Sequence, residues 1–249
     1  MLEPEKYEYF DLSIPLKFNG PQPNAFGVEP ATSTACEYGD LIGDTRRDGS
    51  CNFERVTLIP HCNGTHTECV GHITNELIFV RECLQDVLMT ATLVTVVPVS
   101  ANDGDLLITP EMLLGTPEND ALIVRTLAND DSKLSAVYDE DRIPPYFTAD
   151  AITYIVECGV KHLLVDLPSI DRLFDEGKLA NHRIFWNVEQ ESFETTNETR
   201  INSTITELIY VPNGVKDGEY LLNLQIAPFE ADASPSRPVL FDRVPESGL

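Results

Sequence analysis

The sequence predicts a mixed α/β fold in which strands outnumber helices, built as a single domain over residues 1–249. Apolar, β-branched segments of strand length recur along the chain, and two segments with helix-start signals lie between them. No linker, repeat or low-complexity tract divides the sequence. The composition agrees with a packed globule, since 42% of the residues are hydrophobic and 23% are charged.

Strands are predicted where β-branched and aromatic residues cluster between turn-forming residues. The predicted strands cover 8–18, 53–60, 88–99, 121–127, 160–166, 203–211 and 218–226. The last two flank Pro212-Asn213-Gly214, which is a typical turn sequence. Residues 19–50 are rich in Gly, Pro, Asn and Asp, so we expect a long surface excursion there that serves as a lid or binding loop.

Two helices are predicted from their capping signals. The first covers 109–115, with Thr109 as N-cap and Pro110 at the first helical position. The second opens at Thr148 and ends at Gly159. Its apolar face consists of Ile152, Ile155 and Val156.

Charge excludes two classes of partner. The chain carries 17 Lys and Arg against 41 Asp and Glu, a formal net charge of −24. Binding nucleic acid or an anionic membrane needs clustered positive charge, so we expect neither partner. Residues 1–6 lack the apolar stretch of a secretory signal. We therefore expect a cytoplasmic protein whose six cysteines are reduced.

The strongest functional signal is a cluster of potential metal ligands in residues 59–72. Three of the five histidines of the chain, His61, His66 and His72, lie within twelve residues, together with Glu68 and two cysteines. His66 and Glu68 are two positions apart, so on an extended segment both side chains face the same side. Imidazole, carboxylate and thiolate groups are ligands of zinc and manganese. The cluster therefore predicts a metal or catalytic site.

The segment His61-Cys62-Asn63-Gly64-Thr65-His66-Thr67-Glu68, with His72 after it, resembles the signature of the cyclase-like metal hydrolases. That family includes bacterial kynurenine formamidases and isatin hydrolases. Further segments resemble the family in the same order along nearly the whole chain. They are Phe10–Leu16, Leu164–Asp171, Thr206–Tyr210 and Asp232–Val239.

The resemblance implies a swivelling β/β/α-type cyclase fold, in which helices flank a barrel-like mixed sheet. It also implies a homodimer or homotetramer that holds one or two Zn²⁺ or Mn²⁺ ions per subunit. The metal ligands that it implies are His66, Glu68, His182 and Glu207. Glu68 would be able to bridge two ions, and His72 would be the general acid/base.

The chain departs from the family pattern at three positions. Cys62 stands where the first histidine is expected, and His61 lies one residue earlier. Either the Cys62 thiolate is a ligand, which would favour zinc, or His61 coordinates in its place. Glu68 stands where Asp is usual, and Val70 lies near the position of a usual proline.

The reaction that these residues favour is metal-dependent hydrolysis of the carbon–nitrogen bond in an amide. A divalent ion lowers the pKa of bound water to roughly 7 and polarises the substrate carbonyl. A histidine such as His72 is suited to pass a proton to the leaving amine near neutral pH. The resemblance makes an arylformamidase, which converts N-formylkynurenine to kynurenine and formate, the first expectation.

Three alternatives remain open. The substrate can instead be a cyclic amide or a lactone, as in isatin hydrolases. Cys62 or Cys69 can act as a nucleophile activated by a neighbouring histidine, although nearby carboxylates oppose thiolate formation. The third alternative is a metal-containing binding protein without catalysis.

Other residues have less specific interpretations. Asp166 is either a turn cap or a partner for a metal-ligating histidine, and Asp171 is expected to be a surface cap. His162 is expected to be structural. Phe26, Tyr146 and Phe147 can form the wall of an aromatic substrate pocket, but aromatic residues more often belong to the core. We expect substrate specificity to reside in 19–50 and in an apparent insertion at 183–203.

Overall fold

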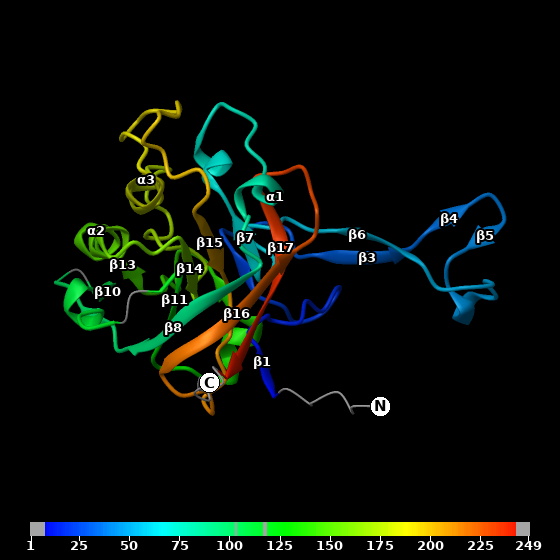
Figure 1. The fold of residues 1–249 in the computed structure, drawn as a ribbon. Coiled ribbons are helices and arrows are strands. Elements are labelled where there is room, and N and C mark those ends of the chain that lie inside the picture. The colour runs from blue at the N-terminus through cyan, green and yellow to red at the C-terminus, as the bar shows by residue number, and fades with distance from the viewer. Residues whose placement is uncertain (1–7, 103, 117–118, 243–249) are drawn as a thin grey trace, which may run out of the picture.

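The computed structural model describes residues 8–102, 104–116 and 119–242, and the acidic start at residues 1–6 lies outside these ranges. Its centre is a ring of seven strands, which Figure 1 shows together with the helices around it. The ring order is β17-β16-β8-β11-β14-β15-β7, and β7 pairs back with β17 to close it. The strands are β7 (His66–Glu68), β8 (Leu88–Val96), β11 (Ala121–Thr126), β14 (His162–Val165), β15 (Thr204–Glu207), β16 (Gly218–Ile226) and β17 (Ala233–Asp242).

The sheet is mixed. Strands β8, β11, β14 and β15 run parallel to their neighbours within that group, whereas β7, β16 and β17 form antiparallel pairs. Strand β1 (Tyr9–Asp11) adds to the outer edge of β17 in antiparallel register. The expected mixed α/β fold with a barrel-like sheet is therefore confirmed.

Alternation along the strands produces two apolar cores. Side chains such as Leu93, Ile123 and Leu164 belong to one core, and their neighbours Leu122 and Leu163 belong to the other. Successive side chains of a strand point to opposite faces, so the two cores lie on the two faces of the sheet. Helices α2 (Ala149–Glu157) and α3 (Ala180–Trp186) pack into the second core. The first core therefore fills the interior of the barrel.

The two predicted helices have different outcomes. Helix α2 forms where expected, and the Thr148 hydroxyl accepts the N–H of Ala151 as its cap. The expected helix at 109–115 is wrong, because only a 3₁₀ turn forms at Pro110–Met112 and Thr109 makes no side-chain cap bond. One turn of suitable residues is too short to stabilise a longer helix, even though Leu113 is buried in the core. Helices α1 (Val80–Cys83) and α3 were not expected from the sequence pattern.

Residues 19–50 are more ordered than the expected loop. They contain β2 (Asn24–Ala25) and most of an arm that projects from the barrel (Figure 1). The arm pairs β3 (Thr32–Ala35) with β6 (Glu54–Thr57) and ends in a hairpin of β4 (Glu37–Tyr38) and β5 (Leu41–Ile42). The predicted strand at 53–60 therefore belongs to the arm and not to the barrel. The strand predicted at 8–18 is confined to β1.

The remaining elements are short. Strands β9 (Val99–Ser100), β10 (Leu106–Ile108) and β13 (Tyr146–Phe147) form a small sheet, and β12 (Val137–Tyr138) pairs with β2. Further 3₁₀ turns lie at Thr45–Arg47, Val70–Ile73 and Asp131–Ser135. Among the described residues, no helix has the length and apolar character needed to cross a membrane.

Asp166 links the end of β14 to the end of β11 through hydrogen bonds of its carboxylate. Its buried carboxylate accepts the backbone N–H and the hydroxyl of Thr126, both at 2.9 Å, and pairs with Lys133 Nζ at 2.7 Å. Burial raises the pKa of Asp166, while the nearby Lys133 ammonium opposes that shift. These bonds account for the carboxylate of Asp166, which makes none of its described contacts with a histidine.

Replacing Lys133 with methionine should destabilise the fold. The substitution leaves the Asp166 charge buried without its cation, and breaking such a pair costs roughly 3–5 kcal/mol. Urea unfolding followed by circular dichroism measures the loss. Lys178→Met is the control, because Lys178 pairs with Glu176 in solvent and its loss should leave the midpoint nearly unchanged. Equal midpoints for the two variants would contradict the role assigned to Asp166.

Candidate metal centre

Strand β7 brings the candidate ligands together because it is paired along both edges. On one edge, His66 lies opposite Glu207 of β15 in antiparallel register. On the other edge, Glu68 lies opposite Ala233 of β17. His66 and Glu68 are two residues apart on the strand, so their side chains share the face on which α3 packs. That face receives His182 from α3.

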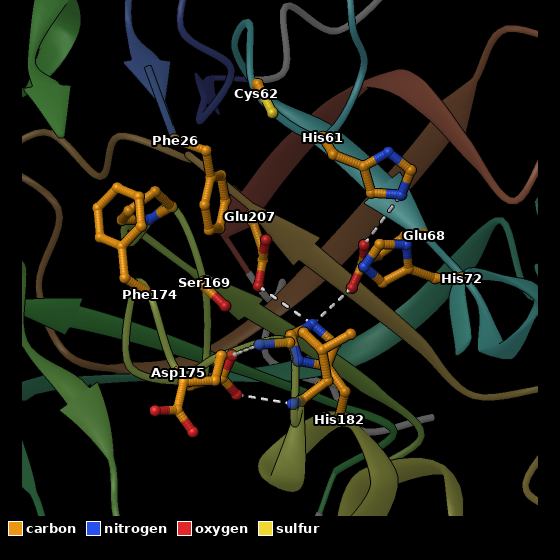
Figure 2. Close-up of a pocket in the computed structure, with 14 residues that line it drawn as sticks. Phe26, His61, Cys62, Glu68, His72, Ser169, Phe174, Asp175, His182 and Glu207 are labelled. Atoms are coloured by element: carbon orange, nitrogen blue, oxygen red, sulfur yellow. Dashed lines mark hydrogen bonds and ion pairs between the residues drawn. The ribbon is translucent and has the colours of Figure 1, made fainter. Parts of the chain in front are cut away.

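Figure 2 shows the side chains of Glu68, His182 and Glu207 pointing toward one another, and His66 lies beside Glu207. His182 Nε2 is 2.9 Å from Glu68 Oε1 and 3.7 Å from Glu207 Oε1. His66 Nε2 is 3.6 Å from Glu207 Oε2, and all four side chains are buried. Residues predicted as ligands from the first and last thirds of the chain therefore meet at one place.

Two groups of donor atoms share Glu68. The first group is formed by His66, Glu68 and Glu207, and the second by His61, Glu68 and His72. Within each group the donor atoms lie within 4.8 Å of one another. The two oxygens of Glu68 face different partners, since Oε1 is nearest His182 and Oε2 is 3.4 Å from His61 Nε2. This arrangement suits one cation or two cations bridged by Glu68.

His66 provides a direct test of whether the site fits a metal. Its Nδ1 donates to the carbonyl of Gly64 at 3.0 Å, which directs the unprotonated Nε2 into the site. This Nε2 is fully buried and makes no hydrogen bond. A buried polar atom without a partner costs free energy. A divalent cation would give this nitrogen the partner that the protein itself does not supply.

The pKa shifts of the site residues also bear on whether a cation fits the site. Burial, reinforced by the neighbouring charge of Glu68, holds the pKa of Glu207 well above its ordinary value. Burial lowers the pKa of His66 to about 4, so this imidazole is neutral at pH 7. Burial opposes ionisation of Glu68 too, but His72 and His182 outweigh it and hold the pKa of Glu68 below its ordinary value. A cation bound between Glu207 and the neutral imidazole of His66 would favour the ionised form of Glu207.

Asp171 orients His182. Its Oδ2 lies 2.6 Å from His182 Nδ1, and its two oxygens also accept the backbone N–H groups of Asn181 and His182. The expected surface position of Asp171 is wrong, because the side chain is buried, although its carboxylate does accept backbone N–H groups at the start of α3. Sequence reasoning missed the pairing because ten residues, most of them in a loop, separate the two residues. The family-like Asp-Leu-Pro-Ser-Ile-Asp segment was the signal that contained it.

Asp232 has a similar role on the opposite side of the site. It directly precedes β17, and its Oδ2 lies 3.1 Å from His61 Nε2 and 3.4 Å from His72 Nδ1. The rings of His61 and His72 stack with their centroids 4.3 Å apart. Hydrogen bonding to His61 and then to His72 holds the pKa of Asp232 far below its ordinary value. The surrounding segment resembles the family, but sequence reasoning assigned no role to Asp232.

His61 and Cys62, the two alternatives for the first ligand, are placed differently relative to the donor groups. His61 belongs to a donor group, whereas Cys62 lines the same cavity and its sulfur belongs to neither group among the described residues. Burial, followed by the charges of Glu207 and Glu68, raises the pKa of Cys62 to about 11. The thiol of Cys62 is therefore protonated at neutral pH, which disfavours it as a nucleophile. Cys69 is buried in a small apolar cluster with Val80 and Cys83.

The donor atoms open onto a cavity of about 570 Å³, a size typical of small-molecule sites. Phe26 lines this cavity, whereas Phe147 is buried in the core and the Tyr146 hydroxyl donates to Asp105. His162 lies outside the cavity and its Nδ1 is 2.9 Å from the Thr204 hydroxyl, in agreement with the structural role expected for it. Of residues 183–203, Phe185 and Trp186 pack into the core behind His182.

Asp171→Asn should weaken metal binding or turnover by about 10- to 100-fold, as loss of a partner of a metal-ligating histidine typically does. The amide cannot hold the imidazole of His182 with a charge-assisted bond. Metal content by mass spectrometry and kcat measure the effect. The control is Asp150→Asn on the exposed side of α2, which should change neither value. An Asp171→Asn protein with full metal content and full activity would contradict the role assigned to Asp171.

His61→Ala and Cys62→Ala should differ in metal affinity. Loss of the His61 imidazole removes a member of a donor group and should lower the metal content or the affinity of one ion. Loss of the Cys62 sulfur should leave the metal content unchanged. Titration of each apo-protein with Zn²⁺ and Mn²⁺ measures the affinities. If Cys62→Ala lowered the metal affinity and His61→Ala did not, Cys62 would be the ligand.

Known proteins resemble this chain over nearly its whole length. Kynurenine formamidase of Bacillus cytotoxicus is 26% identical over 238 residues, which cover 94% of this chain and 97% of that protein. A predicted metal-dependent hydrolase from Bacillus stearothermophilus has a similar structure, with a TM-score of 0.63 at 17% identity over 96% of this chain and all of the other. Isatin hydrolase A from Labrenzia aggregata superposes with a TM-score of 0.61 at 13% identity, over 94% and 93% of the two chains.

The family model named Cyclase, described as putative cyclase, matches residues 10–172. That range is about two thirds of the chain, and it includes the segment from His61 to His72 as well as Asp171. The chain therefore belongs to the cyclase family.

Proposed function

We propose that this chain, a metal-dependent hydrolase of the cyclase family, cleaves the carbon–nitrogen bond of an amide. The reaction that it most resembles is that of an arylformamidase, in which N-formylkynurenine gives kynurenine and formate. The single observation that carries the proposal is the buried, unpartnered Nε2 of His66, which faces two buried carboxylates. The resemblance to kynurenine formamidases over 94% of the chain supports the substrate class.

The ligands that we propose are His66, Glu68, His182 and Glu207, with His61 completing a second group around Glu68. When bound there, Zn²⁺ or Mn²⁺ would acidify a water molecule and polarise the amide carbonyl. The protein side chains hold these groups in place before substrate arrives. Gly64 and Asp171 fix the ring orientations of His66 and His182, so little reorganisation is needed on binding.

We propose that His72 moves the proton to the leaving amine. It lines the cavity and lies on the short 3₁₀ turn directly after β7. Asp232 faces its Nδ1 at 3.4 Å, which would keep a proton on that nitrogen and leave Nε2 to exchange protons with substrate. Because His72 also belongs to the second donor group, the alternative role is that of a metal ligand.

Hydrolysis of a cyclic amide or lactone is the second candidate, since the same ligands would act on a carbonyl within a ring. The shared fold with isatin hydrolases is compatible with it. We further propose that the protein is a homodimer or homotetramer. The projecting arm supports this, because it exposes Tyr38 and Val56, and a two-stranded ribbon is only marginally stable alone. A cytoplasmic location stays a prediction.

Removal of the metal should abolish amide hydrolysis. Dialysis against a chelator should eliminate turnover of an aryl formamide, and added Zn²⁺ or Mn²⁺ should restore it. His72→Ala should lower kcat by about 10²- to 10⁴-fold, the usual contribution of a general acid/base, without loss of metal. Cys62→Ala is the control and should stay active.

Three results would redirect the assignment. Activity that survives chelation but disappears in Cys62→Ala would select a thiol mechanism. A His72→Ala protein that has lost metal would make His72 a ligand. Bound metal without hydrolysis of formamides, cyclic amides or lactones would indicate a binding protein.

A further inference from the structure

The cavity above the candidate metal centre has an aromatic wall. The rings of Phe26 and Phe174 meet edge to face, with centroids 5.9 Å apart and planes at 70°. The two residues are 40% and 37% exposed although both line the cavity. In Figure 2 they lie on the opposite side of the cavity from His61 and His72. Exposed phenyl rings beside a reaction centre suit an aryl group, because they offer it apolar, edge-to-face contact.

The rim next to this wall is acidic. Asp175 and Glu176 follow Phe174 directly, and both line the cavity. The Asp175 carboxylate is fixed, because it accepts the N–H of Gly177 at 2.9 Å and that of Leu179 at 2.6 Å. Glu176 extends into solvent, where Lys178 pairs with it at 2.8 Å. The rim therefore has fixed negative charge, and its nearest ammonium is already paired.

A positive partner for a substrate anion is missing from the lining. Among the described residues that line the cavity, none is lysine or arginine. The imidazoles of His61 and His182 already face Glu68, and His72 faces Asp232. A carboxylate on the far end of a bound aryl group would therefore meet phenyl rings and Asp175. An unpaired charge in such surroundings costs binding free energy, and this cost creates specificity against it.

We propose that the site selects aryl amides whose ring carries a substituent of zero or positive net charge, and that it rejects those whose substituent has a net negative charge. This inference rests on the proposed function and specifies its substrate class. Phe26 and Phe174 hold the ring, while the fixed carboxylate of Asp175, in a lining without lysine or arginine, sets the preferred charge. The ring substituent lies away from the amide, so a metal bound at the amide does not compensate the charge of the substituent.

Three formanilides test the inference, because their para substituents are neutral, cationic and anionic, and the two charged compounds together separate the sign of the charge from polarity and size. The para substituents are methyl, aminomethyl and carboxymethyl, and the methylene group limits their electronic effect on the amide. For the metal-loaded protein at low ionic strength, kcat/KM for the carboxymethyl compound should be at least about tenfold below that for the methyl compound. The aminomethyl compound should equal or exceed the methyl compound. Added salt should reduce the differences in kcat/KM between the three compounds, because it screens the charge of the rim.

Glu176→Arg tests the rim directly. It removes one negative charge, adds a positive one and frees Lys178, so kcat/KM for the carboxymethyl compound should rise relative to the methyl compound. The matched control is Glu191→Arg, because Glu191 is also exposed and has the same φ of 65° but does not line the cavity. The control should retain the wild-type selectivity.

The possible failures are distinguishable. Equal kcat/KM values for the neutral and anionic compounds, or a Glu176→Arg protein with unchanged selectivity, would overturn charge selection but leave amide hydrolysis intact. If none of the three compounds is hydrolysed, the proposed function fails. Calorimetric binding of the same compounds then decides the present inference, since equal Kd values would overturn it and weaker binding of the carboxymethyl compound would support it.

Discussion

The pairing of the short strand β7 along both of its edges is the constraint on which the rest of the structure depends. These three residues close the barrel between β15 and β17, and they also carry His66 and Glu68. Because side chains alternate along a strand, a shift of one residue would turn both groups away from His182 and Glu207. The same strand pairing therefore closes the barrel and assembles the site.

This arrangement places unusual charge in the protein interior. Glu68 and Glu207 are buried close together, and the groups that face them are imidazoles rather than lysine or arginine. Neutral imidazole nitrogens are metal ligands, whereas buried ammonium and guanidinium groups would occupy the carboxylates permanently. Because their partners are imidazoles, the two carboxylates remain available to bind a cation.

The departure from the family pattern at Cys62 has a structural counterpart. His61, one residue earlier, reaches the site, and it is held there by stacking on His72 and by Asp232. Asp232 in turn is positioned by the pairing of β17 with β7. The extra methylene of Glu68 is accommodated within the same network, since its two oxygens face histidines from different segments.

Much of the barrel could be predicted from the sequence, because the central strands are continuous apolar runs. The local part of the site was also predictable, since Gly64, His66 and Glu68 lie within five residues. The roles of Asp171 and Asp232 were not, because each depends on a loop that no spacing rule describes. The arm at 32–57 was predicted only in part, because the strand expected at 53–60 forms β6 whereas β3, β4 and β5 lie in the segment expected to be a loop. Residues 32–35 of β3 are small and mostly polar, and none of them is fully buried, so they lack the apolar alternation that marks a packed strand.

Crystallographic anomalous scattering at the zinc and manganese absorption edges would test the central claim most directly. Our account predicts a strong peak within coordination distance of His66 Nε2 and both Glu68 and Glu207, with any second peak between Glu68 and His61. A crystal grown with excess metal that showed no peak at these side chains, or metal bound only elsewhere, would contradict it.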